Sequence, residues 1–216
     1  RLATNLDGIE SMSLSSNSIA SGYFTELAIE HPDGTEERYP ELEFDTDTSF
    51  FSTMHIHLAE GLQPADALKK YGTSFYINER YARLKNVSSE DFGQKTLQDI
   101  LPRVRVKYIL AGMIENYPTA SLQKEINPQR IMVRESGDTY LGQIGKYVLI
   151  RLKPEKRKAT LERIERIWKE MFNGQELVYT DMHQRFMELN KDMMQLNRIL
   201  NTYSLIALLL TCFGVF

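Results

Sequence analysis

The last residues of the chain form an uncharged apolar run, which limits what the C-terminal part can be. From Tyr203 to Phe216 no residue is charged, and Ser204 and Thr211 are polar exceptions. As a helix this run spans roughly 20 Å, against about 30 Å of bilayer hydrocarbon. It is too short to cross a bilayer but is still apolar at its end. We interpret residues 204–216 as the start of a transmembrane helix, with a buried helix of a soluble core as the alternative.

The segment before this run carries a heptad pattern. Its apolar residues are spaced alternately four and three apart, with charged and amide side chains between them. Such a narrow stripe suits packing against one other helix, and the alternative is an ordinary amphipathic helix on its own domain. Because no proline follows Asp181, the pattern predicts one continuous helix of about 50 Å, with a stalk over residues 181–203. The predicted helix-packing seam consists of Met182, Phe186, Leu189, Met193, Leu196, Leu200 and Tyr203.

The composition is that of a globular protein and narrows the function classes. The 216 residues are 42% hydrophobic and 25% charged, and the net charge of -3 does not point to a nucleic-acid partner. The single cysteine, Cys212, excludes an intrachain disulfide. Residues 1–6 read as the last turns of a helix that begins upstream, so we expect both ends to be cut edges of a longer protein.

Alternating and turn-bounded segments predict a sheet with a few short helices. Asp33-Gly34 is a strong hairpin signal, since glycine tolerates positive φ. Asn78 is placed to cap a helix over residues 79–84, and residues 45–48 to cap another over 49–54. The predicted strands cover residues 8–15, 24–30, 37–39, 42–44, 74–77, 104–114, 147–152 and 177–179.

A longer helix is predicted from Glu155 to Phe172. Pro154 stands where a helix tolerates a first-turn proline, and Asn173-Gly174 is expected to end the helix. Its apolar face should pack on the sheet that holds the strand 147–152. That face consists of Leu161, Ile164, Ile167, Trp168, Met171 and Phe172. Strand, helix and strand in this order indicate an α+β fold with helices on one face of a sheet.

Motifs for catalysis or cofactor binding are not found in the sequence. A glycine-rich phosphate loop and a nucleophile elbow are both missing, so we expect no enzyme, no catalytic residue and no bound cofactor. His55 and His57 could share a face, with Asp45, Asp47 or Glu60 as further metal ligands. The ligand spacing is not that of a known site, so we predict surface histidines and no metal.

A basic cluster surrounds the start of the predicted long helix. The preferred interpretation is a solvated helix start, and the alternative is contact with anionic lipid headgroups or an acidic partner. The cluster consists of Arg151, Lys153, Lys156, Arg157 and Lys158.

Several segments together resemble the periplasmic domain of FtsX-like and MacB-like permeases of ABC transporters. The resemblance covers nearly the whole chain. It is carried by residues 9–12, 47–54 followed by 58–61, 75–79, 109–117, 126–128 and 201–216.

This resemblance implies a two-lobed, MacB-like periplasmic core domain between two transmembrane helices. A discontinuous porter-like lobe would comprise residues 1–20 and 145–180, and an inserted mixed α/β lobe residues 21–144. A stalk helix over 181–203 and the start of a transmembrane helix over 204–216 would follow. The resemblance also implies that a separate ABC ATPase subunit or domain binds ATP, and that this domain faces the periplasm from the bacterial inner membrane.

Two functions follow from these features. The first is coupling of ATP-driven motion in the stalk helices to work on a periplasmic substrate or protein partner, with a second permease copy or repeat as a further partner. The second is an extracytoplasmic ligand-binding or sensory domain of a membrane receptor, which would require a deep pocket with convergent polar groups. The transported or released substrate is not specified by any of these residues.

Overall fold

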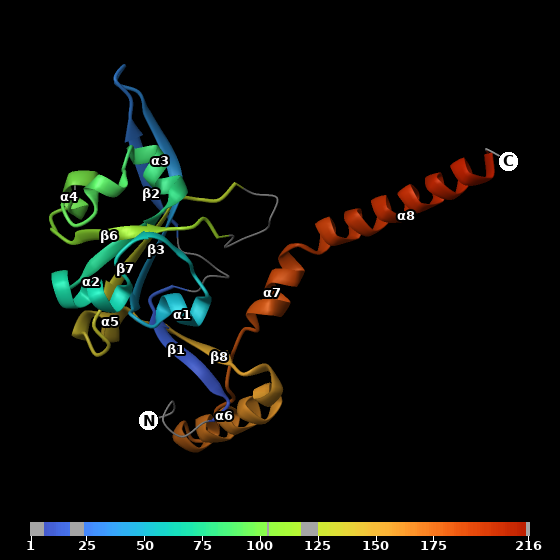
Figure 1. Cartoon of the computed structure of the whole chain (residues 1–216). Coiled ribbons are helices and arrows are strands. Elements are labelled where there is room, and N and C mark those ends of the chain that lie inside the picture. The colour runs from blue at the N-terminus through green and yellow to red at the C-terminus, as the bar shows by residue number, and fades with distance from the viewer. Residues whose placement is uncertain (1–6, 18–23, 103, 118–124, 215–216) are drawn as a thin grey trace. The chain divides into compact units, whose positions relative to one another are not determined.

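The computed structural model describes residues 7–17, 24–102, 104–117 and 125–214 (Figure 1). The chain divides into two compact units. The first comprises Arg1–Tyr117 and Ile126–Val178, and the second Pro118–Glu125 and Tyr179–Phe216. The division of the first unit into a porter-like and an inserted lobe stays a prediction.

The first unit contains strands and short helices, and the second contains two helices in its described part. The strands are β1 (Ile9–Ser15), β2 (Phe24–Glu30), β3 (Glu36–Asp47), β4 (Leu58–Gly61), β5 (Ser74–Asn78), β6 (Ile109–Ile114), β7 (Gln129–Arg134) and β8 (Tyr147–Leu152). The helices are α1 (Phe50–Met54), α2 (Pro64–Tyr71), α3 (Glu79–Lys85), α4 (Leu97–Ile100), α5 (Thr139–Ile144), α6 (Arg157–Met171), α7 (Met182–Leu189) and α8 (Lys191–Gly214), with 3-10 turns η1 (Ser89–Asp91) and η2 (Pro154–Lys156).

One mixed sheet organises the first unit. Its strand order is β4-β6-β5-β7-β3-β1-β8, and β2 pairs with β3. The long β3 connects β2 with the central strands, because its first half pairs antiparallel with β2 and its second half pairs parallel with β7. The hairpin between β2 and β3 turns at Gly34, whose φ of 82° is the left-handed conformation that glycine tolerates.

Helices cover both faces of the central strands β5 and β7, whose residues are all buried. One face carries Phe75 and Ile77 and is packed by buried residues of α3 and α4. On the other face Tyr76 meets Phe51 of α1 edge to face, with ring centroids 4.9 Å apart. The expected α+β class is therefore confirmed as a mixed α/β fold, but its helices lie on both faces of the sheet rather than on one.

The strands β1 and β8 and the helix α6 lie together at one end of the first unit (Figure 1). Gly8 packs against Thr160 of α6, and a β-carbon at Gly8 would lie only 2.9 Å from the Thr160 β-carbon. Such a distance is shorter than real contacts allow. The absence of a side chain at Gly8 is therefore what lets the helix approach the start of β1.

The face predicted for α6 is only partly confirmed. Ile164 is buried and Trp168 is half-buried, as expected for a packing face. Met171 is 61% exposed, and Phe172 stacks on the Trp168 indole with ring centroids 4.2 Å apart. Phe172 thus covers the indole rather than the sheet, so the last turn of the helix does not belong to the packing face.

Most local predictions are confirmed, and two strand predictions are wrong. The Asn78 side chain caps α3 by accepting from the Tyr81 amide at 3.0 Å. Asn173 and Gly174 both have positive φ where α6 ends. The strand predicted over 104–114 begins only at Ile109, because the Tyr108 carbonyl instead accepts a hydrogen bond from the amide of Leu97, the first residue of α4. Residues 177–179 are irregular, and they pair with no strand in the described part of the chain.

The contact at Gly8 gives a stability prediction. Gly8→Ala should destabilise the first unit by about 1–3 kcal/mol, because the added methyl group forces Thr160 and α6 away from β1. The matched control is Gly142→Ala, since Gly142 lies in α5 with open space around it and should be neutral or stabilising by up to about 1 kcal/mol. Urea unfolding followed by the fluorescence of Trp168, the single tryptophan, measures both. Equal stability of the two variants would contradict the contact.

Candidate functional site

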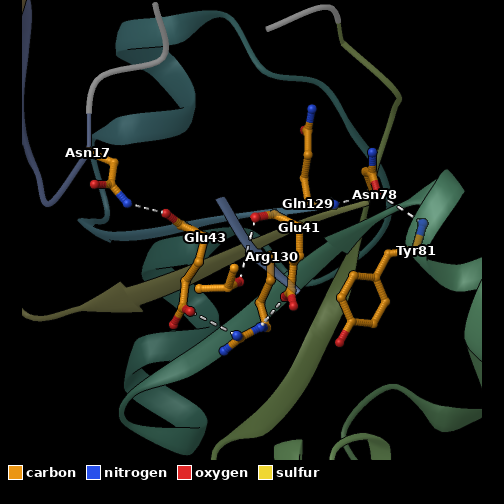
Figure 2. A network of polar contacts seen from close by, with 8 residues as sticks. Asn17, Glu41, Glu43, Asn78, Tyr81, Gln129 and Arg130 are labelled. Atoms are coloured by element: carbon orange, nitrogen blue, oxygen red, sulfur yellow. Dashed lines mark hydrogen bonds and ion pairs between the residues drawn. The ribbon is translucent and has the colours of Figure 1, made fainter. Parts of the chain in front are cut away.

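Charged side chains cross the buried sheet where β3 lies beside β7. Residues 41, 43, 45 and 47 of β3 are all acidic, and their alternate spacing puts them on one face of the strand. The parallel register places Glu43 beside Arg130 and Asp47 beside Arg134 of β7. We call these six residues the charge ladder, and it consists of Glu41, Glu43, Asp45, Asp47, Arg130 and Arg134. Figure 2 shows Glu41, Glu43 and Arg130.

Arg130 joins two carboxylates of the ladder. Its Nε donates to Glu41 at 2.8 Å and its Nη2 donates to Glu43 at 2.9 Å. The side chains of Arg130 and Glu41 are 7% and 2% exposed, so this pairing is almost dry. Burial raises the pKa of Glu41 despite the opposing charge of Arg130. The two carboxylates outweigh the effect of burial on the guanidinium and keep the pKa of Arg130 above its usual value.

Arg134 pairs with one carboxylate and two aromatic rings. Its Nε donates to Asp45 at 2.7 Å. The guanidinium carbon lies 4.4 Å from the centroid of the Tyr140 ring and 5.3 Å from that of Tyr108. This arrangement fits the planar guanidinium, which stacks on aromatic faces while it bonds a carboxylate.

The remaining ladder residue, Asp47, fastens β1 and α1 to β3. Its carboxylate accepts from the Ser13 hydroxyl at 2.8 Å, from the Leu14 amide at 3.0 Å and from the Ser49 amide at 2.9 Å. These bonds supplement a short β1–β3 pairing that registers Ser15 with Thr46. Asp47 is therefore one polar link between β1 and the central sheet. Two others follow β1: the Ser16 hydroxyl accepts from the Asp45 amide at 2.9 Å, and the Asn17 side chain donates to the Glu43 carbonyl at 2.6 Å.

At the end of β5, the neutral side-chain amide of Asn78 also links neighbouring elements through hydrogen bonds. The Asn78 side chain accepts from the amides of Tyr81 and Gln129 and donates to the Asn127 carbonyl, each at 3.0 Å (Figure 2). One buried side chain thus joins β5, α3 and β7. Like Arg130 in the charge ladder, it bonds protein partners on neighbouring elements, so both arrangements serve the fold.

The predicted stalk helix is not continuous. Residues 181–214 form α7 and α8, which are separated at Asn190. The Asn190 side chain donates to the Phe186 carbonyl at 2.9 Å, and the backbone there has φ -111° and ψ 11°. The Asn190 backbone amide also donates to the Phe186 carbonyl at 3.2 Å, so the interruption falls where an asparagine adds a side-chain bond to the helix ladder. The prediction of one helix of about 50 Å is therefore wrong.

The predicted seam is divided between these two helices. Met182, Phe186 and Leu189 lie on α7, and Met193, Leu196, Leu200 and Tyr203 lie on α8. Met182 and Leu189 are half-buried, whereas Leu196, Leu200 and Tyr203 are 53%, 54% and 66% exposed. That the seam packs against another helix stays a prediction.

The second half of α8 is apolar on its surface. After Arg198 no described residue of α8 is charged. Its exposed large side chains include Leu205, Ile206, Leu208, Leu209 and Phe213. Among the helices that the structure describes, none combines the length and the apolar character needed to cross a membrane.

The other candidate residues lie at the surface. His55 and His57 are exposed, as predicted, and His55 ends α1 in the left-handed conformation. No cluster of potential metal ligands occurs among the described residues. In the basic cluster, the Arg151 Nε donates to the Thr53 carbonyl at 2.7 Å, so this residue fastens α1 to β8. Lys153 and Lys156 both pair with Asp7.

Comparisons with known proteins relate the fold to solved structures only. No family model matches the chain, and no curated protein matches it. The chain is similar to the extracellular domain of the noncanonic ABC-type transporter YknZ from Gram-positive bacteria, with 10% identity, a TM-score of 0.48 and coverage of 80% of this chain and 81% of that one.

Two further structures are similar to the same extent. For the periplasmic region of MacB from Actinobacillus actinomycetemcomitans, the identity is 9%, the TM-score 0.48 and the coverage 81% of this chain and 72% of that one. For a domain from Porphyromonas gingivalis that is described as part of a permease protein, the values are 12%, 0.47, 79% and 73%.

The charge ladder predicts a strong effect of removing Arg130. Arg130→Met should destabilise the first unit by about 3–5 kcal/mol at neutral pH, because the buried Glu41 and the partly buried Glu43 lose their cation. Glu41→Gln is the control: Arg130 keeps Glu43 and the amide oxygen can still accept, so we expect a cost within about 1.5 kcal/mol. Urea unfolding measures both. A loss in Glu41→Gln as large as that in Arg130→Met would show that the ladder does not depend on the guanidinium.

The raised pKa of Glu41 predicts a pH dependence of stability. Between the pKa of Glu41 in the unfolded chain and its higher pKa in the folded chain, the unfolded chain has released this proton while the folded chain retains it. The free energy of unfolding therefore decreases as the pH rises through this window, and it stays at the lower value above it. Glu41→Gln should remove this acid-range decrease. In Arg130→Met the loss should shrink as the pH falls, since protonated carboxyls need no cation. Unfolding curves between acid and neutral pH test both statements, and parallel pH profiles for all three proteins would contradict them.

Proposed function

We propose that this chain is the extracytoplasmic domain of an ABC transporter permease. It would couple ATP-driven motion of membrane stalk helices to work on a substrate or partner outside the membrane. It would sit on the periplasmic side of the bacterial inner membrane and carry out no catalysis. ATP would be bound by a separate ATPase subunit, and no cofactor by this chain.

The observation that carries this proposal is the uncharged, exposed half of α8. Burying one leucine-sized side chain stabilises by roughly 1.5–3 kcal/mol, so exposing Leu205, Leu208, Leu209 and Phe213 to water together is strongly unfavourable. A bilayer would remove this cost, since lipid tails solvate apolar side chains. The family resemblance of the sequence adds the ABC transporter, and the seam on α7 and α8 adds a second helix that moves with them.

The coupling would depend on movement of the helix pair. In the proposed arrangement, the seam residues of α8 face the other stalk helix of the full permease. ATP binding in the partner subunit would shift these two helices against each other. The sheet domain would follow, because the charge ladder and the Asn78 bonds hold its strands in one register.

A crosslink between the two helices in the full permease tests this function. One cysteine replaces Leu200, the other lies opposite it in the helix before residue 7, and Cys212→Ser removes the native thiol. We expect oxidation to stop transport or release of substrate while ATP hydrolysis continues, and reduction to restore it. Each single-cysteine variant is the control. Transport at the normal rate in the crosslinked protein would favour a static binding domain, such as the receptor alternative.

A further inference from the structure

Four cations gather where the chain enters the first unit. Lys153, Lys156, Arg157 and Lys158 lie between the end of β8 and the first turn of α6. The Lys153 amide donates to the Gly8 carbonyl at 2.9 Å, which fixes this turn beside the start of β1. We call these four residues the basic corner.

The counter-charges at the basic corner are few. Asp7 pairs with Lys156 and lies 3.7 Å from Lys153, and Glu155 is the other acid within the segment. Asp7 is itself largely exposed, and Lys156, Arg157 and Lys158 are exposed too. The corner therefore carries more positive than negative charge, in a chain whose net charge is -3.

Helix stability does not account for these cations. The positive end of a helix dipole lies at the N-terminus, where acidic side chains stabilise and basic ones destabilise. Glu155 lies in η2, which runs directly into α6, but the first turn of α6 itself contains no acidic residue and Lys156 occupies its N-cap position. In α2 the same chain follows the favourable pattern, with Asp66 in the first turn and Lys69 and Lys70 in the last. The lysines of α6 therefore call for an explanation outside the helix.

We propose that the basic corner contacts the anionic phospholipid headgroups of the membrane from which the chain emerges. This inference rests on the proposed function, in which the segment ahead of Asp7 comes from the bilayer. A bilayer presents phosphates over its whole surface, so separate flexible cations can engage it without a shaped groove. It is also the one acidic surface that the proposed function places beside Asp7, which favours lipid over an acidic protein.

Vesicle binding of the full chain tests the inference. The chain is diluted from mild detergent onto phosphatidylcholine vesicles with or without phosphatidylglycerol, and partitioning is measured by flotation. We expect phosphatidylglycerol to strengthen binding in a salt-sensitive manner. Lys156→Gln with Lys158→Gln should weaken this anionic increment by about 25-fold, at about fivefold per lysine. Asp7→Asn should strengthen the anionic increment, because it removes the negative charge that pairs with Lys153 and Lys156.

The controls separate this inference from the proposed function. Lys69→Gln with Lys70→Gln makes the same charge change on α2 and should leave the anionic increment intact. Binding to vesicles of phosphatidylcholine alone measures the insertion of α8. If the chain did not bind these vesicles, the proposed membrane attachment would be contradicted, but the lipid contact of the basic corner would not. Equal binding to both vesicle types, or equal effects of the two lysine pairs, would overturn the lipid assignment.

Two further outcomes would assign the corner to another anion. Tight binding of soluble polyglutamate without any preference for phosphatidylglycerol would indicate an acidic protein partner and refute the lipid contact. Release of the chain by inorganic phosphate, but not by sodium chloride at the same ionic strength, would indicate a site for a single phosphate group.

Discussion

In the first unit, the buried guanidinium of Arg130 compensates the buried carboxylate of Glu41 and the partly exposed carboxylate of Glu43. β3 presents an acidic side chain at every second position from Glu41 to Asp47, on a face that is largely buried. Arg130 can compensate Glu41 and Glu43 only while β7 keeps its register beside β3. A slip by one residue would turn the arginine to the opposite face. The position of β7, and through it of β5 and β6, therefore depends on where Arg130 finds its partners.

Local chemistry in the sequence predicted the boundaries of several elements, but not this charge pairing. The turn at Gly34, the cap at Asn78 and the helix end at Asn173 each depend on neighbouring residues alone. Arg130 and Glu41 are 89 positions apart, and only the parallel pairing of β3 with β7 brings them together. β7 itself was missed because Arg130 and Arg134 point inward, so a fully buried strand reads as half polar.

The C-terminal helices show the same limit of sequence patterns. Heptad spacing across residues 182–203 predicted one helix, since periodicity reports which side chains share a face and not whether the backbone continues. The Asn190 amide ends α7 by bonding the Phe186 carbonyl, a choice that the apolar pattern does not record. As a result α7 and α8 are separate segments. The side chains of α8 still leave an apolar surface that favours a nonpolar environment over water.

The pairing of β1 with β8 explains how such a domain would follow a moving membrane helix. Ile9, the first residue of β1, registers with Leu152, the last residue of β8. The start of β1 thus lies beside the end of β8, which leads on to α6. A displacement applied at this end would move β1 and β8 together rather than slide one strand along the other. In the proposed function, Asp47 would transmit that displacement to β3 through its bonds to Ser13 and Leu14, and Arg151 would transmit it to α1 through the Thr53 carbonyl. The bonds that place β1 and β8 on the sheet are therefore those that would carry motion into it.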